Sequence, residues 1–161
     1  MRNRKPKRAA VYGLASLAWI GVLFFFSGQS GVESGELSEW LTQKLFGEWI
    51  ARGVDALMLE HLLRKAAHFG IFAVMGFLAG MTFLHLLRRR TAVCIALMAS
   101  AGLAVSNELH QRLSDARTCS VTDMAIDAGG AALGLLVALL LLWLSGYWRD
   151  RTKKGYTGDL K

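Results

Sequence analysis

The chain has 161 residues with a formal net charge of +7, and 53% of the residues are hydrophobic. This length accommodates one domain, and a mean hydropathy of +0.35 is high for a water-soluble protein. The basic residues gather beside apolar stretches, which indicates orientation signals and contacts with anionic lipid and argues against nucleic-acid binding.

Four apolar stretches approach or reach the length of about 20 residues that a helix needs to cross a bilayer. They occupy residues 9–27, 66–87, 91–108 and 124–144. A soluble bundle would need a charged stripe on each helix, and these stretches show none. We therefore predict an all-α fold, an integral membrane four-helix bundle that residues 1–161 form as a single domain.

Basic clusters precede the first stretch, fill the turn at residues 88–90 and follow the fourth stretch. The positive-inside rule then places both termini and this turn in the cytoplasm. No Ala-x-Ala-like site follows the first stretch, so we expect a retained anchor and not a signal peptide. Cys94 and Cys119 fall on opposite sides of the membrane in this topology, so they are not expected to pair within one chain.

The segment at residues 28–60 lies outside the membrane in this topology and carries a helical pattern. Ser34 or Ser38 is the predicted N-cap of a helix. Apolar residues then recur at helical spacing between charged ones: Leu37, Trp40, Leu41, Leu45 and Trp49. This pattern predicts an amphipathic helix that lies in the interface on the outer side of the membrane. We favour a packing role over the bundle above a role as a lid or a lipid-contacting surface.

The remaining spans carry signs of close packing. Gly76 and Gly80 are four residues apart in the second span, and Gly130 and Gly134 are four apart in the last, which permits close helix approach. The short turn at residues 88–90 makes the second and third spans an antiparallel hairpin. Ser120 or Thr122 is the predicted N-cap of the last span.

Polar residues converge at one depth. His68, Glu108 and Asp127 each lie about 27–33 Å of helix rise from the basic residues at the far end of their spans. Ser27 ends the first span at a similar depth, and Lys65, Gln111 and Asp123 lie about one turn further out. Residues three or four apart share a helix face. A lipid-facing charge near the bilayer centre costs ~3 kcal/mol or more, so these groups are expected to turn inward, with Arg117, into one outward-facing pocket.

The residue types suggest roles in that pocket. His68 with Glu108 or Asp123 suits a general base and the group that orients it. Lys65 and Arg117 suit a phosphate or carboxylate, and the planar guanidinium of Arg117 is the better bidentate partner. The alternatives are structural: the cations reach headgroups, His68 bridges two helices, and the carboxylates neutralise nearby cations. Gln111 then links helices, and Asp123 caps the last span.

A metal centre is a second hypothesis, because His68, Glu108, His110 and Asp123 offer nitrogen and oxygen ligands. Their spacing matches no dedicated metal motif. We therefore predict no cofactor, and a divalent cation remains the alternative.

These residues also carry a family resemblance, from about residue 23 to residue 144. The elements Phe26-Ser27-x-Gln29, Lys65-x-x-His68-Phe69 and Glu108-x-x-Gln111 resemble elements of the VanZ-like membrane proteins. So does the run Arg117-x-x-Ser120-x-x-Asp123-x-x-x-Asp127 that continues to Gly130 and Gly134. The chain departs from the family pattern at Asn107, where a carboxylate is usual, and at Asp127, where asparagine is usual.

The resemblance implies a bacterial cytoplasmic membrane protein linked to glycopeptide (teicoplanin) resistance. It adds Ser27, Gln29 and Ser120 to the ligand-binding residues Lys65, Gln111, Arg117 and Asp127, beside the catalytic candidates His68, Glu108 and Asp123. The expected partners are membrane lipids and an anionic envelope lipid or lipid-linked peptidoglycan precursor. The alternative is a non-enzymatic accessory or scaffold protein whose polar network is structural. A transporter is less favoured, because the chain shows no inverted repeat.

Overall fold

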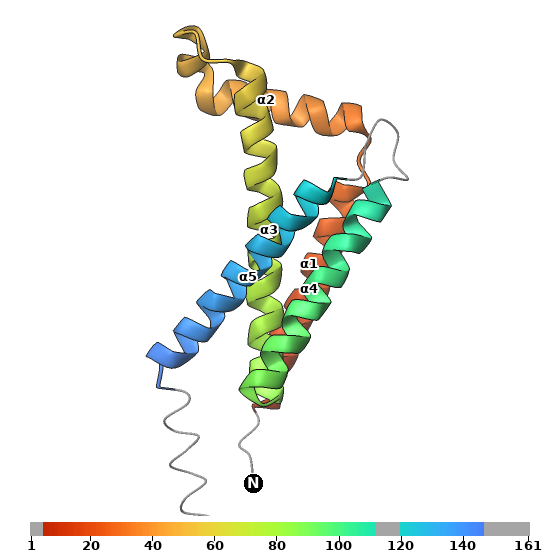
Figure 1. The fold of residues 1–161 in the computed structure, drawn as a ribbon, viewed down its shortest axis with the longest axis vertical. Helices are drawn as coiled ribbons and strands as arrows, with labels where there is room; N and C mark the ends of the chain where they lie inside the picture. The colour runs from red at the N-terminus through yellow and green to blue at the C-terminus, as the bar shows by residue number, and fades with distance from the viewer. Residues whose placement is uncertain (1–4, 112–119, 147–161) are drawn as a thin grey trace, which may run out of the picture.

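The computed structural model describes residues 5–111 and 120–146, and these ranges contain five α-helices and no β-strand (Figure 1). The helices are α1 (Pro6–Ser27), α2 (Gly31–Ala51), α3 (Ala56–Leu86), α4 (Arg89–Gln111) and α5 (Val121–Leu144). All but α2 are long and apolar enough to cross a membrane. The prediction of an all-helical, multi-pass membrane protein with four spanning helices is therefore confirmed.

The helix α3 is the centre of the bundle, because it packs against each of the other four. In Figure 1 the α2 helix lies across one end of the bundle, and the turn between α3 and α4 lies at the opposite end. We call these the α2 end and the hairpin end. The antiparallel hairpin expected at residues 88–90 is present, since α3 ends at Leu86 and α4 begins at Arg89.

The α3 and α5 helices cross at close range, and α5 runs obliquely over α3 in Figure 1. A Cβ atom on Gly134 would overlap the carbonyl oxygen of Ala73, and one on Gly76 would overlap the carbonyl oxygen of Ala131. Gly130 lies equally close to the backbone of Phe69. The two glycine pairs therefore permit the close approach that their spacing predicted.

The start of α2 differs from the prediction. Ser30, and not Ser34 or Ser38, is the N-cap: its Oγ accepts a hydrogen bond from the backbone N–H of Glu33 at 3.2 Å. The backbone N–H of Ser30 donates to the Glu33 carboxylate at 2.9 Å in return. This reciprocal capping box places the N-cap four residues before Ser34. These hydrogen bonds from Ser30 also lower the pKa of the exposed Glu33 carboxyl below its usual value.

Replacing Ser30 with alanine should weaken α2 by about 1 kcal/mol, the usual effect of losing an N-cap. Because the pKa of Glu33 is lowered in the folded protein, the capping box stabilises α2 above the ordinary pKa of glutamate. That stabilisation is lost as the pH falls through the lowered value. Hydrogen exchange of the α2 amides should speed up in Ser30→Ala, whereas Ser34→Ala should leave the first turn protected. Equal exchange in the two variants would contradict the capping assignment.

The apolar residues of α2 divide into two groups. Leu37 and Leu41 line a cavity beneath the helix, described below. Trp40, Leu45 and Trp49 are more than half exposed in the isolated chain, at 56%, 59% and 56%. Exposed tryptophans at this end suit contact with lipid headgroups, and the interfacial placement of α2 stays a prediction.

The helix α3 begins at Ala56, well before the residue 66 expected from hydropathy. The Asp55 side chain caps it by accepting a hydrogen bond from the backbone N–H of Leu57 at 2.9 Å. Its first turn is apolar, but Glu60, Arg64 and Lys65 follow, and Arg64 donates to Glu60 one turn earlier at 2.9 Å. Hydropathy alone missed this part of the helix for that reason. As a result, Lys65 and His68 lie well inside a continuous helix.

Candidate functional site

Ionisable groups from α3 and α5 meet in two pairs at the α2 end. The Lys65 ammonium donates a hydrogen bond to Oδ1 of Asp123 at 3.1 Å. One turn deeper, Nδ1 of His68 lies 3.2 Å from Oδ1 of Asp127. The spacing of three residues on α3 and four on α5 places each set on one helix face, as the sequence predicted. The orienting partner of His68 is thus Asp127, and not Asp123 or Glu108.

The α4 helix contributes Glu108, whose side chain is 0% exposed. Its Oε2 accepts a hydrogen bond from the backbone N–H of Ser120 at 2.9 Å. Ser120 is the N-cap of α5, and its Oγ accepts from the backbone N–H of Asp123 at 3.2 Å. One of the two predicted caps, Ser120, is therefore confirmed. The Asp123 side chain does not serve as the cap and is paired with Lys65 instead.

The deepest part of the site holds His68, Glu108 and Asp127, which we call the buried trio. One ligand-type atom from each of the three lies within 4.8 Å of the others. Glu108 and Asp127 are both 0% exposed. Within residues 5–111 and 120–146, Oε1 of Glu108 and Oδ2 of Asp127 have no hydrogen-bond partner. The trio therefore presents two unused acceptor atoms in a buried position.

His110 lies apart from the buried trio. Its Nδ1 is 3.3 Å from the Ser27 hydroxyl, and its ring packs edge-on against Phe24 of α1. The Ser27 hydroxyl also donates to the backbone oxygen of Asn107 at 3.4 Å. Ser27 and His110 thus tie α1 to α4. The structure assembles His68, Glu108 and Asp127 as a metal-type cluster, which differs from the set with His110 and Asp123 that the sequence suggested.

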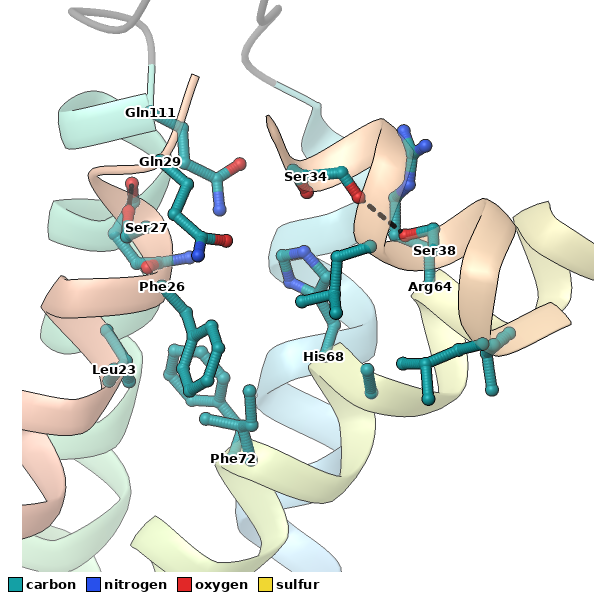
Figure 2. Close-up of a pocket in the computed structure, with 16 residues that line it drawn as sticks. Leu23, Phe26, Ser27, Gln29, Ser34, Ser38, Arg64, His68, Phe72 and Gln111 are labelled. Atoms are coloured by element: carbon teal, nitrogen blue, oxygen red, sulfur yellow. Dashed lines mark hydrogen bonds between the residues drawn. The ribbon is translucent and has the colours of Figure 1, made fainter. Parts of the chain in front are cut away.

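A cavity of about 300 Å³ opens beside His68. Figure 2 shows Gln29 and Gln111 on one side of this cavity and Ser34, Ser38 and His68 on the other. Its polar residues come from α1, α2, α3, α4 and the α1–α2 turn. Leu23 and Phe72 lie at its apolar floor in Figure 2, and its other apolar residues are Phe26, Leu37, Leu41, Leu63, Ala67 and Ile71. The cavity is therefore amphipathic, with polar groups gathered on its walls.

The predicted site residues fall into three groups. Ser27, Gln29, His68 and Gln111 line the cavity. The residues Lys65, Glu108, Ser120, Asp123 and Asp127 form the hydrogen-bonded network connected with His68 and the start of α5. Arg117 lies outside the described residues, as does Cys119. Cys94 is exposed and unpaired in the described chain.

Comparison with protein families decides what kind of membrane protein this is. The model of the VanZ/LLP1 family matches residues 12–142. The chain belongs to the VanZ/LLP1 family. The comparison with curated proteins found no match, and neither did the comparison with solved structures. The two positions at which this VanZ-family chain departs from the usual pattern, Asn107 and Asp127, are both buried at the site.

Four polar residues that line the cavity were not predicted as site residues: Ser34 and Ser38 of α2, Arg64 of α3 and Asn107 of α4. Arg64 stands one residue before the Lys-x-x-His element, and Asn107 stands one residue before Glu108. Ser34 and Ser38 share a face because they are four apart, and Ser38 Oγ donates to the Ser34 carbonyl at 2.8 Å. With Ser30 as the N-cap, both serines lie inside α2, the helix that covers the cavity.

The Lys65–Asp123 pair should make a small contribution to stability. Both side chains are 29% exposed, so water screens their attraction. Replacing the two residues singly and together, as Lys65→Met and Asp123→Asn, should give a coupling of about 0.2–1 kcal/mol. Thermal unfolding in detergent measures this cycle. A coupling well above this range would mean that the pair is a main determinant of the α3–α5 contact.

Proposed function

We propose that this protein recognises or modifies an anionic envelope lipid or lipid-linked peptidoglycan precursor on the outer side of the bacterial cytoplasmic membrane. In this proposal its activity contributes to glycopeptide (teicoplanin) resistance, in keeping with the VanZ-like motifs. The observation that carries the proposal is the amphipathic cavity beside His68, which lies under α2. A cavity with an apolar floor and polar walls suits a molecule with a hydrocarbon chain and a polar headgroup.

The charge distribution supports an outward-facing cavity. Arg88, Arg89 and Arg90 lie at the hairpin end, and Lys7 and Arg8 lie at the start of α1. By the positive-inside rule, this end faces the cytoplasm and the α2 end faces outward. The exposed tryptophans of α2 then lie at the level of the outer headgroups.

The cavity residues suggest how such a ligand binds. The floor around Leu23 and Phe72 accepts the first part of a hydrocarbon chain, and Gln29 and Gln111 offer amide donors to phosphate oxygens. Arg64 also lines the cavity and adds a positive charge. His68 has its Nδ1 held by Asp127, so Nε2 is the ring nitrogen that exchanges a proton with a bound ligand.

Binding of a short polyprenyl pyrophosphate tests the proposal. Farnesyl pyrophosphate should bind the purified protein in nanodiscs, and farnesol, which lacks the charged group, should bind at least about tenfold more weakly because it forfeits charge-assisted hydrogen bonds. Ala67→Trp should block binding, because Ala67 lines the cavity. Ala66→Trp is the matched control, since its neighbour Ala66 is exposed and does not line the cavity. Equal binding to both variants would contradict a role for the cavity.

Growth on teicoplanin tests the cellular role. A strain that depends on this chain for tolerance should lose it when His68 is replaced by alanine or Glu108 by glutamine, while both variants still insert into the membrane. Tolerance equal to wild type in both variants would exclude proton transfer by these groups.

A non-enzymatic scaffold is the alternative function, and a specific observation favours it. The pairs Lys65–Asp123 and His68–Asp127 link α3 to α5, and Glu108 links α4 to the start of α5. A network of this kind is also what a purely structural role requires. The scaffold is favoured if the network variants melt at sharply lower temperatures and neither they nor wild type bind farnesyl pyrophosphate. Unchanged or higher melting temperatures of the variants favour a binding site.

A further inference from the structure

The buried trio has more acceptor atoms than its surroundings supply with donors. Glu108 and Asp127 are fully buried, and one oxygen of each carboxylate has no hydrogen-bond partner within the described ranges. Burying an ionised carboxylate is costly unless a cation or hydrogen bonds compensate its charge. Two such oxygens beside one imidazole therefore call for a further positive charge.

Among residues 5–111 and 120–146, the cations near the trio do not supply it. The Lys65 ammonium is hydrogen-bonded to Asp123, at 3.1 Å. His68 carries at most one positive charge and is paired with Asp127. The hydrogen bond that Glu108 accepts comes from the neutral backbone N–H of Ser120. Even with His68 protonated, the described part of the chain gives the trio one cation for two carboxylates.

We propose that His68, Glu108 and Asp127 bind a divalent cation of the Mn²⁺ or Zn²⁺ type. Ligand atoms that sit about 2.0–2.2 Å from one metal lie no more than about 4.4 Å apart. The three ligand-type atoms of the trio lie within 4.8 Å of one another, and side-chain shifts on the order of 1 Å would bring them to the ~3.4 Å separations of a tetrahedral Zn²⁺ site. One imidazole with two carboxylates suits Zn²⁺ and Mn²⁺ better than Ca²⁺, which prefers oxygen ligands alone.

The surroundings of the trio are those of a prepared metal site. Each ligand comes from a different long helix: α3, α4 and α5. The Ser120 backbone N–H holds Oε2 of Glu108 in place and leaves Oε1 as the ligand atom. Such outer hydrogen bonds orient the carboxylate ligands of metals. Three protein ligands leave coordination positions open, and His68 connects them with the cavity.

The cation site rests on the trio alone and not on the proposed function. If a cation is bound, the His68 nitrogen that ligates it no longer acts as a base. The cation then offers its open positions to an anionic oxygen of a ligand in the cavity, as Lewis-acid sites do. A bound cation would therefore stabilise negative charge at the place where an unliganded His68 would exchange a proton.

Mn²⁺ binding by the full-length protein in nanodiscs tests the inference. After treatment with EDTA, the protein is titrated with Mn²⁺, and free Mn²⁺ is followed by electron paramagnetic resonance; Zn²⁺ is then added as a competitor. Wild type should bind a single Mn²⁺ that Zn²⁺ displaces. His68→Gln, Glu108→Gln and Asp127→Asn should each weaken binding roughly 100-fold or more, beyond the 10–100-fold typical of outer-shell changes.

Two histidine variants are matched controls. His61→Gln changes an exposed histidine two turns before His68, and His110→Gln changes the histidine that contacts Ser27. Both should bind Mn²⁺ as wild type does. Loss of binding in His110→Gln equal to that in Asp127→Asn would overturn the assignment of these three ligands.

Folding is checked through the melting temperature. Mn²⁺ should raise the melting temperature of wild type and of His110→Gln, and should not shift that of Asp127→Asn, because only a folded site gains stability from its ligand. No binding of Mn²⁺ or Zn²⁺ by wild type below ~1 mM would overturn the cation site. Farnesyl pyrophosphate binding that persists in that case would leave the proposed function intact, so the two failures are distinguishable.

Discussion

Replacing Gly134 with alanine should destabilise the protein by about 1–3 kcal/mol or more, the range for an added methyl group in a tightly packed contact. The new Cβ atom would overlap the carbonyl oxygen of Ala73 on α3. Backbone atoms cannot move aside as a flexible side chain can. The two helices must therefore separate, and the packing along the whole α3–α5 contact is weakened.

Gly102 of α4 is the matched control, because nothing lies within 4 Å of the Cβ atom that an alanine would place there. Gly102→Ala should melt at or slightly above the wild-type temperature, since alanine is the better helix former. Thermal unfolding in one detergent compares the two variants directly. Similar melting of Gly134→Ala and Gly102→Ala would mean that α3 and α5 do not cross as closely as described.

The glycine contacts also explain how the site is assembled. Gly130 lies against the backbone of Phe69, which is the residue next to His68. Asp127 lies three residues before Gly130 and so shares its helix face. The close approach that Gly130 permits is therefore what brings Asp127 within 3.2 Å of His68. A larger separation between α3 and α5 would break the buried trio as well as the packing.

The sequence predicted the parts of this arrangement that depend on one helix at a time. Hydropathy located four helices, and helix rise placed His68, Glu108 and Asp127 at a common depth. The four-residue spacing of the glycines predicted a close contact. These features follow from the geometry of a single helix, which is nearly constant.

What the sequence left open depends on how helices are rotated against one another. Depth and spacing suggested Glu108 or Asp123 as the partner of His68, whereas the structure pairs His68 with Asp127, which shares a face of α5 with Asp123. His110 was a candidate metal ligand because its ring nitrogens are suitable donors, yet it faces Ser27 of α1. Neighbouring residues on a helix point about 100° apart, so proximity in sequence is a poor guide to a shared site.

The starts of α2 and α3 were missed for a different reason. The predicted α2 began late because its apolar residues at helical spacing start at Leu37, and the predicted α3 began at residue 66 because Arg64 and Lys65 interrupt the apolar run. The signal was present in the sequence as the Ser30-x-x-Glu33 capping box. Because the predicted α2 began too late, Ser34 and Ser38 were interpreted as N-caps. They were therefore not included in the predicted site, although α2 covers the cavity and both serines line it.

Glu108 should show opposite stability effects in two substitutions. Glu108→Ala removes the acceptor of the Ser120 backbone N–H and opens a void in a side-chain position that is 0% exposed. Leaving that buried donor unsatisfied should cost about 1–3 kcal/mol, and the N-terminal turn of α5 should lose hydrogen-exchange protection. Glu108→Gln keeps an acceptor oxygen in nearly the same place, so its stability should equal or exceed that of wild type.

The glutamine variant thereby separates two roles of Glu108: the hydrogen bond that supports the start of α5, and the negative charge of its carboxylate. If Glu108 acts only as a structural link, Glu108→Gln should behave as wild type in melting, in teicoplanin tolerance and in Mn²⁺ binding. If its negative charge is the functional feature, Glu108→Gln should fold normally and lose both of the last two. Melting of Glu108→Gln as low as that of Glu108→Ala would show that the hydrogen bond to Ser120 requires a carboxylate, because a neutral acceptor oxygen would then have failed to replace it.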